Sequence, residues 1–220
     1  MPKVGAEKTR RVQIINGVLE CICESGMDDF TLDDVAIKAG CSKGVVCYYF
    51  KSKKQLQLEA FQAFLSFYAT AITRDLSKAK SPEEALKVVL MHGLPEYLDK
   101  PASEAPIKVV SETDSPDDLV LSPEKKSRLF VLFYSKAILD EDFQKIIRSK
   151  YKKDVEGISS IIGFGVKSGS YNQAVNTDNA AFMLLSVVIG MAIFRAVDFK
   201  PKNKKDYEIC MEMIKKMLKT

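Results

Sequence analysis

Residues 31–56, TLDDVAIKAGCSKGVVCYYFKSKKQL, constrain the fold of this chain more than any other stretch. Thr31 carries a hydroxyl that can accept a free backbone N–H of a first helical turn, and the aspartates at positions 33 and 34 suit the positive end of a helix dipole. The residues that recur at helical spacing are Leu32, Val35, Ala36 and Ala39. Gly40 can adopt the positive φ that ends a helix. The pattern therefore predicts one short helix that begins after Thr31 and ends at Gly40.

A second short helix is predicted directly after the first, capped by Ser42 and running to about Phe50. Val46 and Phe50 are spaced to face inward. The side chains left outside are Lys43, Gly44, Val45, Cys47, Tyr48 and Tyr49. Such a face suits a phosphate backbone and base edges better than plain water. Ser52, with Gln55 three residues later, has the spacing of a capping box and predicts the start of a third helix.

Two helices joined by a tight turn that contains glycine form a helix-turn-helix unit, whose second helix enters the major groove of DNA. An ordinary helical hairpin in an all-α bundle has the same periodicity. The spacing of apolar residues alone leaves both interpretations open.

Residues 8–56 resemble the N-terminal domain of TetR-family transcriptional regulators. The matching marks are Gly26 and Phe30-Thr31 after the opening helix, D-x-V-A-x-x-A-G from Asp33, S-K-G from Ser42, and Y-Y-F-K-S-K-x-x-L from Tyr48. The resemblance covers about the first quarter of the chain, and beyond it only the helical layout matches. Many family members carry an aromatic residue where this chain has Cys47, which puts in doubt one DNA-backbone contact common in the family.

The resemblance implies an all-α fold with a three-helix DNA-binding domain over residues 1–54 and a helical ligand-binding and dimerisation bundle over residues 55–220. It implies a homodimeric repressor that binds a palindromic operator in double-stranded DNA and is released by a small-molecule effector. We assign phosphate contacts to Thr31, Ser42, Tyr48, Tyr49 and Lys53. We assign base-edge contacts to Lys43, Gly44 and Val45, with Cys47 on the same face. The competing interpretation is a helical enzyme or scaffold that uses the bundle without regulating DNA.

Composition is that of a globular chain, with 46% hydrophobic and 28% charged residues. The net charge is only +4, so any affinity for nucleic acid must come from local placement of basic residues. A single histidine, the lack of a glycine-rich phosphate loop and the lack of metal-ligand spacing argue against an enzyme, a cofactor or a metal site.

Five cysteines without a C-x-x-C pair indicate a reducing compartment, and the polar N-terminus lacks the apolar segment of a signal peptide, so we expect a cytoplasmic protein. Cys41 and Cys47 bracket the second short helix. Their spacing allows either a redox switch or plain packing of small residues.

The rest of the chain predicts further helices over residues 8–25, 52–80, 81–98, 123–139, 140–168, from 176 or 177 to 194, and 204–218, with a loop-rich connector from Asp99 to Glu124. Gly93-Leu94-Pro95 interrupts the helix that follows Ser81. The helix from residue 52 is long enough to carry a displacement from the bundle to the helix-turn-helix segment, which is a hypothesis about the mechanism.

The stretch Ala180 to Phe194 is apolar on all sides apart from Ser186 and Gly190. At fifteen residues it falls short of the roughly 20 needed to span a membrane. A helix that is apolar on all sides must be buried on all sides, which requires a second partner surface. We therefore expect a homodimer interface formed by helices at about 140–168 and 177–198. The aromatic, methionine and histidine side chains proposed to line a pocket for a small, largely apolar effector are Met91, His92, Tyr97, Phe130, Phe133, Tyr134 and Phe164. Each of them is also a plausible core residue.

Overall fold

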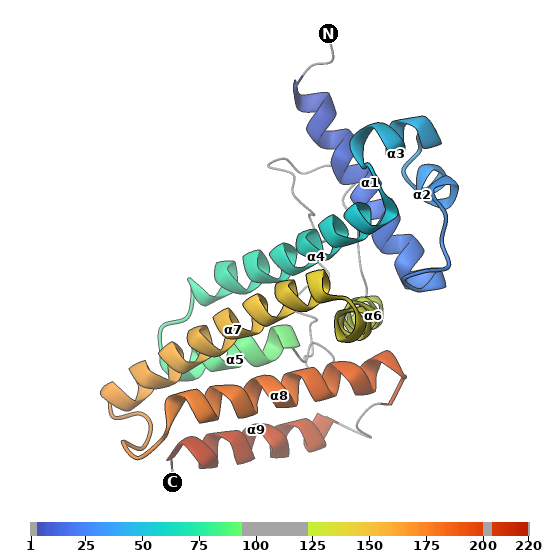
Figure 1. Cartoon of the computed structure of the whole chain (residues 1–220). Coiled ribbons are helices and arrows are strands. Elements are labelled where there is room, and N and C mark those ends of the chain that lie inside the picture. The colour runs from blue at the N-terminus through green and yellow to red at the C-terminus, as the bar shows by residue number, and fades with distance from the viewer. Residues whose placement is uncertain (1–3, 94–122, 200–203, 220) are drawn as a thin grey trace. The chain divides into compact units, whose positions relative to one another are not determined.

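The computed structural model describes residues 4–93, 123–199 and 204–219 (Figure 1). Within these residues every regular element is an α-helix, which confirms the all-α prediction. The helices are α1 (Val4–Ser25), α2 (Leu32–Lys38), α3 (Lys43–Tyr49), α4 (Lys53–Leu76), α5 (Pro82–Gly93), α6 (Pro123–Leu139), α7 (Glu141–Lys167), α8 (Thr177–Ala196) and α9 (Lys204–Lys219). Tyr97 and the expected connector, apart from its last two residues at the start of α6, lie outside the described residues.

The helices group into two compact units. Unit 1 contains α1 to α3, α4 as far as Ala69, α6, and α7 as far as Ile147. Unit 2 contains the remainder of α4 and α7 with α5, α8 and α9. Packing thus associates α6 with the N-terminal helices, whereas the boundary at residue 54 rests on the sequence resemblance and stays a prediction.

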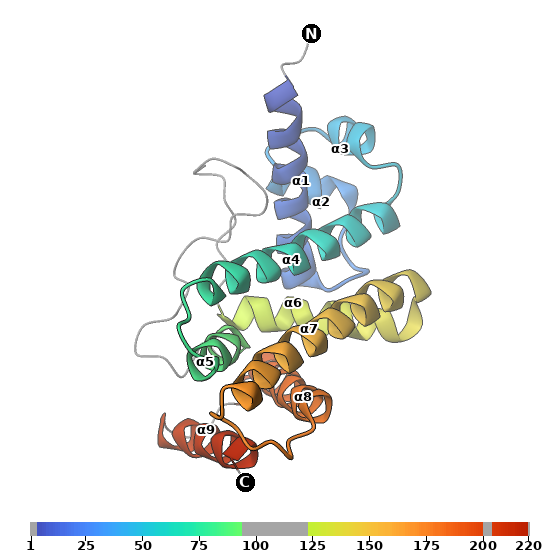
Figure 2. The same cartoon turned by 90° about the vertical axis from the view of Figure 1, so that its left-hand side faces the viewer.

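Helix α1 is the centre of unit 1 because its apolar stripe is completely enclosed: Ile14, Val18 and Ile22 are fully buried. Helices α2 and α6 both pack against α1. Figure 2 shows α3 at the outside of this unit, next to α1 and α2. The helix begins at Val4, four residues earlier than the sequence pattern predicts.

Helices α4, α6 and α7 pack together in unit 1 through a cluster of aromatic rings. The rings of Phe61 and Phe133 stack with their centroids 4.5 Å apart, and Phe143 stacks on Phe61 at 5.8 Å. All three side chains are fully buried, and burying a side chain of this size contributes about 1.5–3 kcal/mol to stability. Phe133 is therefore a core residue in this structure, because its ring packs against the rings of Phe61, Phe64 and Phe143.

Unit 2 is a bundle whose core is formed by Leu86, Leu90, Ile158, Ile162, Ala181, Leu184 and Leu218. Tyr171, in the turn between α7 and α8, packs directly over Gly165, where a Cβ atom would meet the tyrosine ring at 2.1 Å. Only glycine fits at that position of α7. In α9, Leu218 is buried, whereas Met213 is exposed.

The predicted helix start after Ser81 is confirmed, whereas the predicted end of α4 is not. The Ser81 hydroxyl caps the start of α5 by accepting the Glu84 N–H at 3.1 Å, and the Glu84 carboxylate accepts the Lys80 N–H at 2.7 Å. Helix α4 ends at Leu76, one turn earlier than predicted.

Helix α8 is longer than the apolar stretch seen in the sequence. The Asn176 side chain caps it by accepting the Asn179 N–H, and the helix continues for 20 residues. Among the described helices, α8 alone is long and apolar enough to cross a membrane, so the sequence-based argument that it is too short was wrong. A helix packed in a core or an interface meets the same criteria, and this is weak evidence for a membrane.

Candidate nucleic-acid interface

The turn before α2 is fixed by a capping box. The Thr31 hydroxyl accepts the Asp34 N–H at 3.2 Å, and the Asp34 carboxylate accepts the Thr31 N–H at 2.8 Å. The hydrogen bonds that Thr31 donates lower the pKa of Asp34, and the one from its backbone N–H has the largest effect. The predicted cap is confirmed, and the Thr31 hydroxyl is engaged within the chain.

The turn between α2 and α3 depends on Gly40, whose φ of +58° lies in the left-handed region. It allows the Cys41 N–H to donate to the Ala36 carbonyl at 3.0 Å. Beyond the turn, Val46 and Phe50 are buried as predicted. Their burial fixes which side of α3 faces outward.

The outward side of α3 is the one expected from the sequence. Lys43, Gly44, Cys47 and Tyr48 are exposed, with 78% of Tyr48 accessible, while Val45 and Tyr49 are half-buried. The two tyrosine rings meet edge to face at 5.2 Å. Ser42 lies at the N-cap position, but its side chain makes no capping hydrogen bond, so that part of the prediction was wrong.

The Lys43 ammonium, predicted to read a base edge, makes an ion pair with Asp33 at 2.7 Å in this structure. The hydrogen bond to Asp33 raises the pKa of Lys43, so the side chain is cationic at neutral pH. Both side chains are more than half exposed, and pairs of this kind contribute little to stability. A phosphate or a guanine can therefore compete for Lys43 at small cost.

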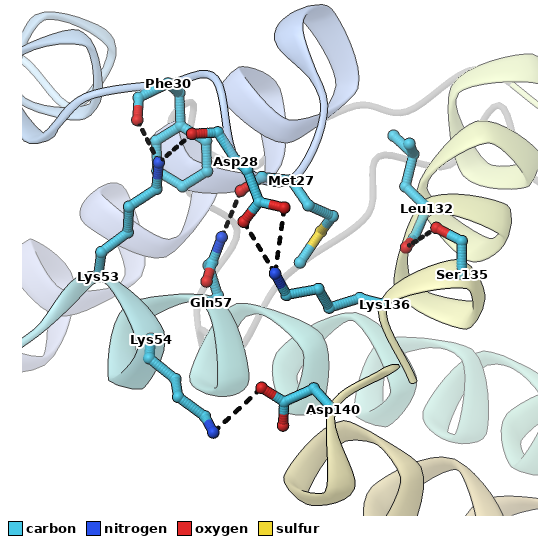
Figure 3. Close-up of polar contacts among 10 residues, drawn as sticks. All are labelled: Met27, Asp28, Phe30, Lys53, Lys54, Gln57, Leu132, Ser135, Lys136 and Asp140. Carbon is cyan, nitrogen blue, oxygen red and sulfur yellow. Dashed lines mark hydrogen bonds and ion pairs between the residues drawn. The ribbon is translucent and has the colours of Figure 1, made fainter. Parts of the chain in front are cut away.

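Lys53, at the start of α4, has a different environment from the one its predicted phosphate contact suggests. Its ammonium donates to the carbonyl oxygens of Asp28 at 2.6 Å and Phe30 at 2.5 Å, and it lies 4.2 Å from the centre of the Phe30 ring (Figure 3). The charge thus supports the main chain of the α1–α2 loop.

Two arginines of α1 hold the C-terminal ends of the short helices, a role that sequence reasoning missed. Arg10 donates to the carbonyl oxygens of Ala39 and Gly40 at 3.3 and 3.4 Å. Arg11 donates to the Tyr49 carbonyl at 3.4 Å and makes an ion pair with Glu59. A cation is favourable at these positions because the carbonyl groups at a helix end carry partial negative charge.

The cysteines differ in how far they are exposed to solvent. Cys47 is exposed on α3, Cys41 is half-buried, and Cys21 and Cys23 are buried. Among the residues described, His, Cys, Asp and Glu side chains form no group of three or more that could hold a metal ion.

The proposed ligand-binding residues are distributed over both units. Phe130 and Tyr134, whose rings stack at 6.3 Å, and the buried Phe133 belong to unit 1. His92 and Phe164 belong to unit 2, and Phe164 is 60% exposed. The side chain of Met91 lies outside the described residues, as does Tyr97.

His92 lines a pocket of about 310 Å³ in unit 2. The other lining residues are Asp75, Lys78, Ala79, Glu84, Lys87 and Val88. The His92 Nε2 atom lies 2.9 Å from the Asp75 carboxylate. Burial alone raises the pKa of Asp75, but hydrogen bonds from His92, Lys78 and Arg74 outweigh it and lower the pKa. Five of the seven residues that line this pocket carry titratable side chains.

Residues 14–60 match the sequence pattern of the bacterial regulatory proteins of the tetR family. This match is confined to the N-terminal segment of the chain, which is similar to the DNA-binding domain of that family. It is 45% identical over 65 residues to the HTH-type transcriptional regulator BetI of Serratia proteamaculans, which is 30% of this chain and 32% of the relative. It is 36% identical over 91 residues to BetI of Stenotrophomonas maltophilia, 41% of this chain and 46% of the relative.

These matches span less than half the length of the curated relatives, all of them named as transcriptional regulators rather than enzymes. The fold of the chain is that of solved TetR-family structures. A putative TetR-family regulator from Rhodococcus sp. superposes with a TM-score of 0.70 at 16% identity, over 97% of this chain and 100% of that one. A putative transcriptional regulator from Saccharomonospora viridis, solved in complex with choline, has a TM-score of 0.73 at 17% identity, over 94% and 95% of the two chains.

Proposed function

We propose that this chain is a homodimeric, sequence-specific DNA-binding repressor of the TetR family that a small effector releases from a palindromic operator. The observation that carries the proposal is the outer side of α3, where a lysine, a glycine and a tyrosine are exposed while Val46 and Phe50 anchor the inner side. A short anchored helix with such a face fits the major groove.

The proposed DNA contacts divide by chemistry. Thr31, Ser42, Tyr48, Tyr49 and Lys53 lie near the start or end of a helix, where hydroxyl and ammonium groups suit phosphates. Lys43, Gly44 and Val45 form the first turn of α3, the part of a recognition helix that approaches base edges. The Ser42 hydroxyl, which makes no capping bond, supports its assignment to a phosphate.

The second half of the proposal is dimerisation through α7 and α8. One side of α8 is packed in unit 2 through Ala181, Leu184 and Arg195, and the opposite side exposes Phe182, Met183, Val187, Ile193 and Phe194. Phe164 adds an exposed ring on α7. A second copy of the chain would bury this apolar surface, which monomeric proteins rarely leave in water.

The effector is proposed to be small and largely apolar and to bind the helical bundle, with His92 in the pocket of unit 2 as a candidate contact. The choline complex of the Saccharomonospora protein makes choline a useful first probe. Thermal unfolding in the presence of choline, and then of a panel of apolar molecules, would identify compounds that stabilise the folded state by mass action.

Gly44→Ala tests the DNA-binding assignment most directly. A Cβ at Gly44 meets only the Ser42 Oγ at 3.8 Å, so the change does not strain the fold and should leave stability equal or slightly raised. It would nevertheless hold DNA away from the α3 backbone. We expect at least a tenfold loss of affinity in an electrophoretic shift with a palindrome from the DNA upstream of the gene.

Gly157→Ala is the matched control, because a Cβ at Gly157, within α7, would meet no atom within 4 Å. It should leave affinity unchanged and raise stability by up to about 1 kcal/mol. Equal affinities of wild type and Gly44→Ala for the operator would contradict the proposal that α3 approaches base edges at this residue.

A further inference from the structure

The main chain of the α1–α2 loop is held by side chains of α4 (Figure 3). Gln57 donates to the Met27 carbonyl, and Lys53 donates to the carbonyls of Asp28 and Phe30. All of these residues belong to unit 1. The loop is therefore positioned by the same helix that follows α3 in the chain.

The side chain of this loop's Asp28 is held by a different helix. The Lys136 ammonium of α6 lies 2.8 and 3.1 Å from the two carboxylate oxygens of Asp28, across 108 residues of sequence. Lys136 is in the last turn of α6 and is three-quarters buried, whereas Asp28 is mostly exposed. The loop is thus the place where α4 and α6 both contact the segment leading into α2.

The turn that follows α6 adds a second polar link to α4. Lys54 makes ion pairs with Asp142 at 2.7 Å and Asp140 at 3.0 Å. These contacts raise the pKa of Lys54, and the hydrogen bond from Lys54 lowers the pKa of Asp140, so Lys54 and Asp140 are charged at neutral pH. The C-terminal end of α6 and the start of α4 consequently hold a defined position relative to each other.

We propose that Asp28 and Lys136 are a positioning pair that connects α6 directly to the helix-turn-helix segment. The connection runs from Lys136 to the α1–α2 loop, then through the Thr31 cap into α2, and across the Gly40 turn into α3. A displacement of α6 reaches the recognition helix by this route without passing along α4. The inference rests on the proposed function for its effect on DNA, but the contact itself is independent of it.

The small free energy of the Asp28–Lys136 ion pair suits a positioning role. A partly exposed ion pair contributes little to overall stability, so breaking it does not unfold the domain. A difference of that size between two positions of α6 changes DNA affinity by about two- to fivefold. The pair therefore acts as an adjustable contact rather than as a structural cross-link.

Asp28→Asn, compared with Asp29→Asn, tests the proposal. Both substitutions remove one negative charge from the same exposed loop, which on electrostatic grounds alone should strengthen DNA binding. We expect Asp29→Asn to bind the operator equally well or more tightly than wild type, and Asp28→Asn to bind it about two- to fivefold more weakly than Asp29→Asn. The double variant Asp28→Lys with Lys136→Asp keeps the net charge and should restore the affinity that Lys136→Met loses.

Hydrogen–deuterium exchange of the free protein gives a readout that does not involve DNA. We expect faster exchange over residues 26–40 in Asp28→Asn and Lys136→Met, with no change in Asp29→Asn and with recovery in the charge-swapped double variant. Unchanged exchange in the first two variants would overturn the pair as a positioning contact.

The two measurements separate failure of this proposal from failure of the proposed function. Faster exchange with unaltered operator affinity overturns the connection to α3 while leaving DNA binding intact. A wild-type protein that binds no DNA at all overturns the proposed function and, with it, the regulatory meaning of the pair, whereas the exchange data still decide whether the contact positions the loop.

Discussion

Four cationic side chains surround the α2–α3 segment, and each has a different environment. Arg10 and Arg11 bind the carbonyl ends of the two short helices, Lys53 binds the carbonyls of the preceding loop, and Lys43 is exposed with an aspartate partner. Three of the four charges thus neutralise groups of the protein itself. Lys43 is the one of these four whose contacts cost least to exchange for DNA.

Lys53→Ala should lower the free energy of unfolding by about 1 kcal/mol, because two carbonyl groups lose a charged donor and the Phe30 ring loses its cation. Urea unfolding measures the change. Lys51→Ala removes the same charge from an exposed position two residues earlier and should have little effect. Equal stability of the two variants would contradict a structural role for the Lys53 ammonium.

The same Lys53 variant tests the phosphate contact. If Lys53 neutralises a phosphate, the slope of log affinity against log salt falls by about one unit per subunit, uniformly across DNA sequences. We retain that expectation. A weaker affinity with an unchanged slope would limit Lys53 to positioning the loop.

Lys43→Ala should relax the preference for one base pair in each half-site, at a cost of about 1–3 kcal/mol for the preferred sequence, because a lysine donates to guanine O6 and N7. Selection from a randomised operator reads this out directly. Asp33→Asn, which frees Lys43 from its partner, is the informative comparison, since it should keep the base preference. An identical base preference in wild type and Lys43→Ala would remove Lys43 from the base-reading set.

Among the elements, α2 and α3 differ in how they begin. Thr31 caps α2 with its side chain, while Ser42 occupies the corresponding position of α3 without a capping bond. The two hydroxyls therefore have separable roles, although the sequence presents both as caps.

Thr31→Ala should destabilise the protein by about 1 kcal/mol, because the Asp34 N–H loses its acceptor. Ser42→Ala should leave stability nearly unchanged and instead weaken DNA binding, since its hydroxyl is free for a phosphate. Thermal or urea unfolding of both variants, paired with an operator titration, distinguishes the two roles. A Ser42→Ala variant that is as destabilised as Thr31→Ala would show that the serine caps α3 after all.

On the scale of the whole molecule, the buried thiols limit stability at high pH. Burial raises the pKa of Cys21 from 9.0 to about 11 and raises that of Cys23 in the same direction. The folded state favours the neutral thiol. The contribution of the thiol to the free energy of unfolding is therefore complete below pH 9 and is lost as the pH rises towards 11.

The loss from Cys21 amounts to about 2 kcal/mol across this range. Cys21→Ala should flatten the decline in urea midpoint between pH 8.5 and pH 10.5, apart from a constant offset caused by the smaller side chain. Cys47→Ala, at an exposed position, should reproduce the wild-type slope. Parallel profiles for all three proteins would contradict the assignment.

Dimerisation is the other property of the whole molecule. Phe182→Glu introduces a charge on the exposed apolar side of α8 and should convert the proposed dimer to a monomer in sedimentation velocity experiments. Met213→Glu, at an equally exposed apolar residue of α9, is the matched control and should remain dimeric. A wild-type protein that sediments as a monomer at micromolar concentration would contradict the proposed interface.

Local signals in the sequence predicted most of the elements and one face of the site. Caps at Thr31, Ser81 and Asn176, the glycine at position 40, and apolar spacing depend on interactions within one or two turns of chain, so the residues themselves carry the information. The outward side of α3 followed from the burial of Val46 and Phe50 for the same reason.

The sequence alone could not identify the partners of long lysine and arginine side chains. It also could not decide whether an aromatic side chain lies in the core or lines a pocket. Lys53, Arg10, Arg11 and Lys136 reach carbonyls or carboxylates that are distant along the chain, and Phe133 is core because Phe61 and Phe143 stack beside it. A residue pattern states which side of a helix is apolar, but not what packs there. Tertiary structure decides this, because burial and charge pairing depend on segments that only folding brings together.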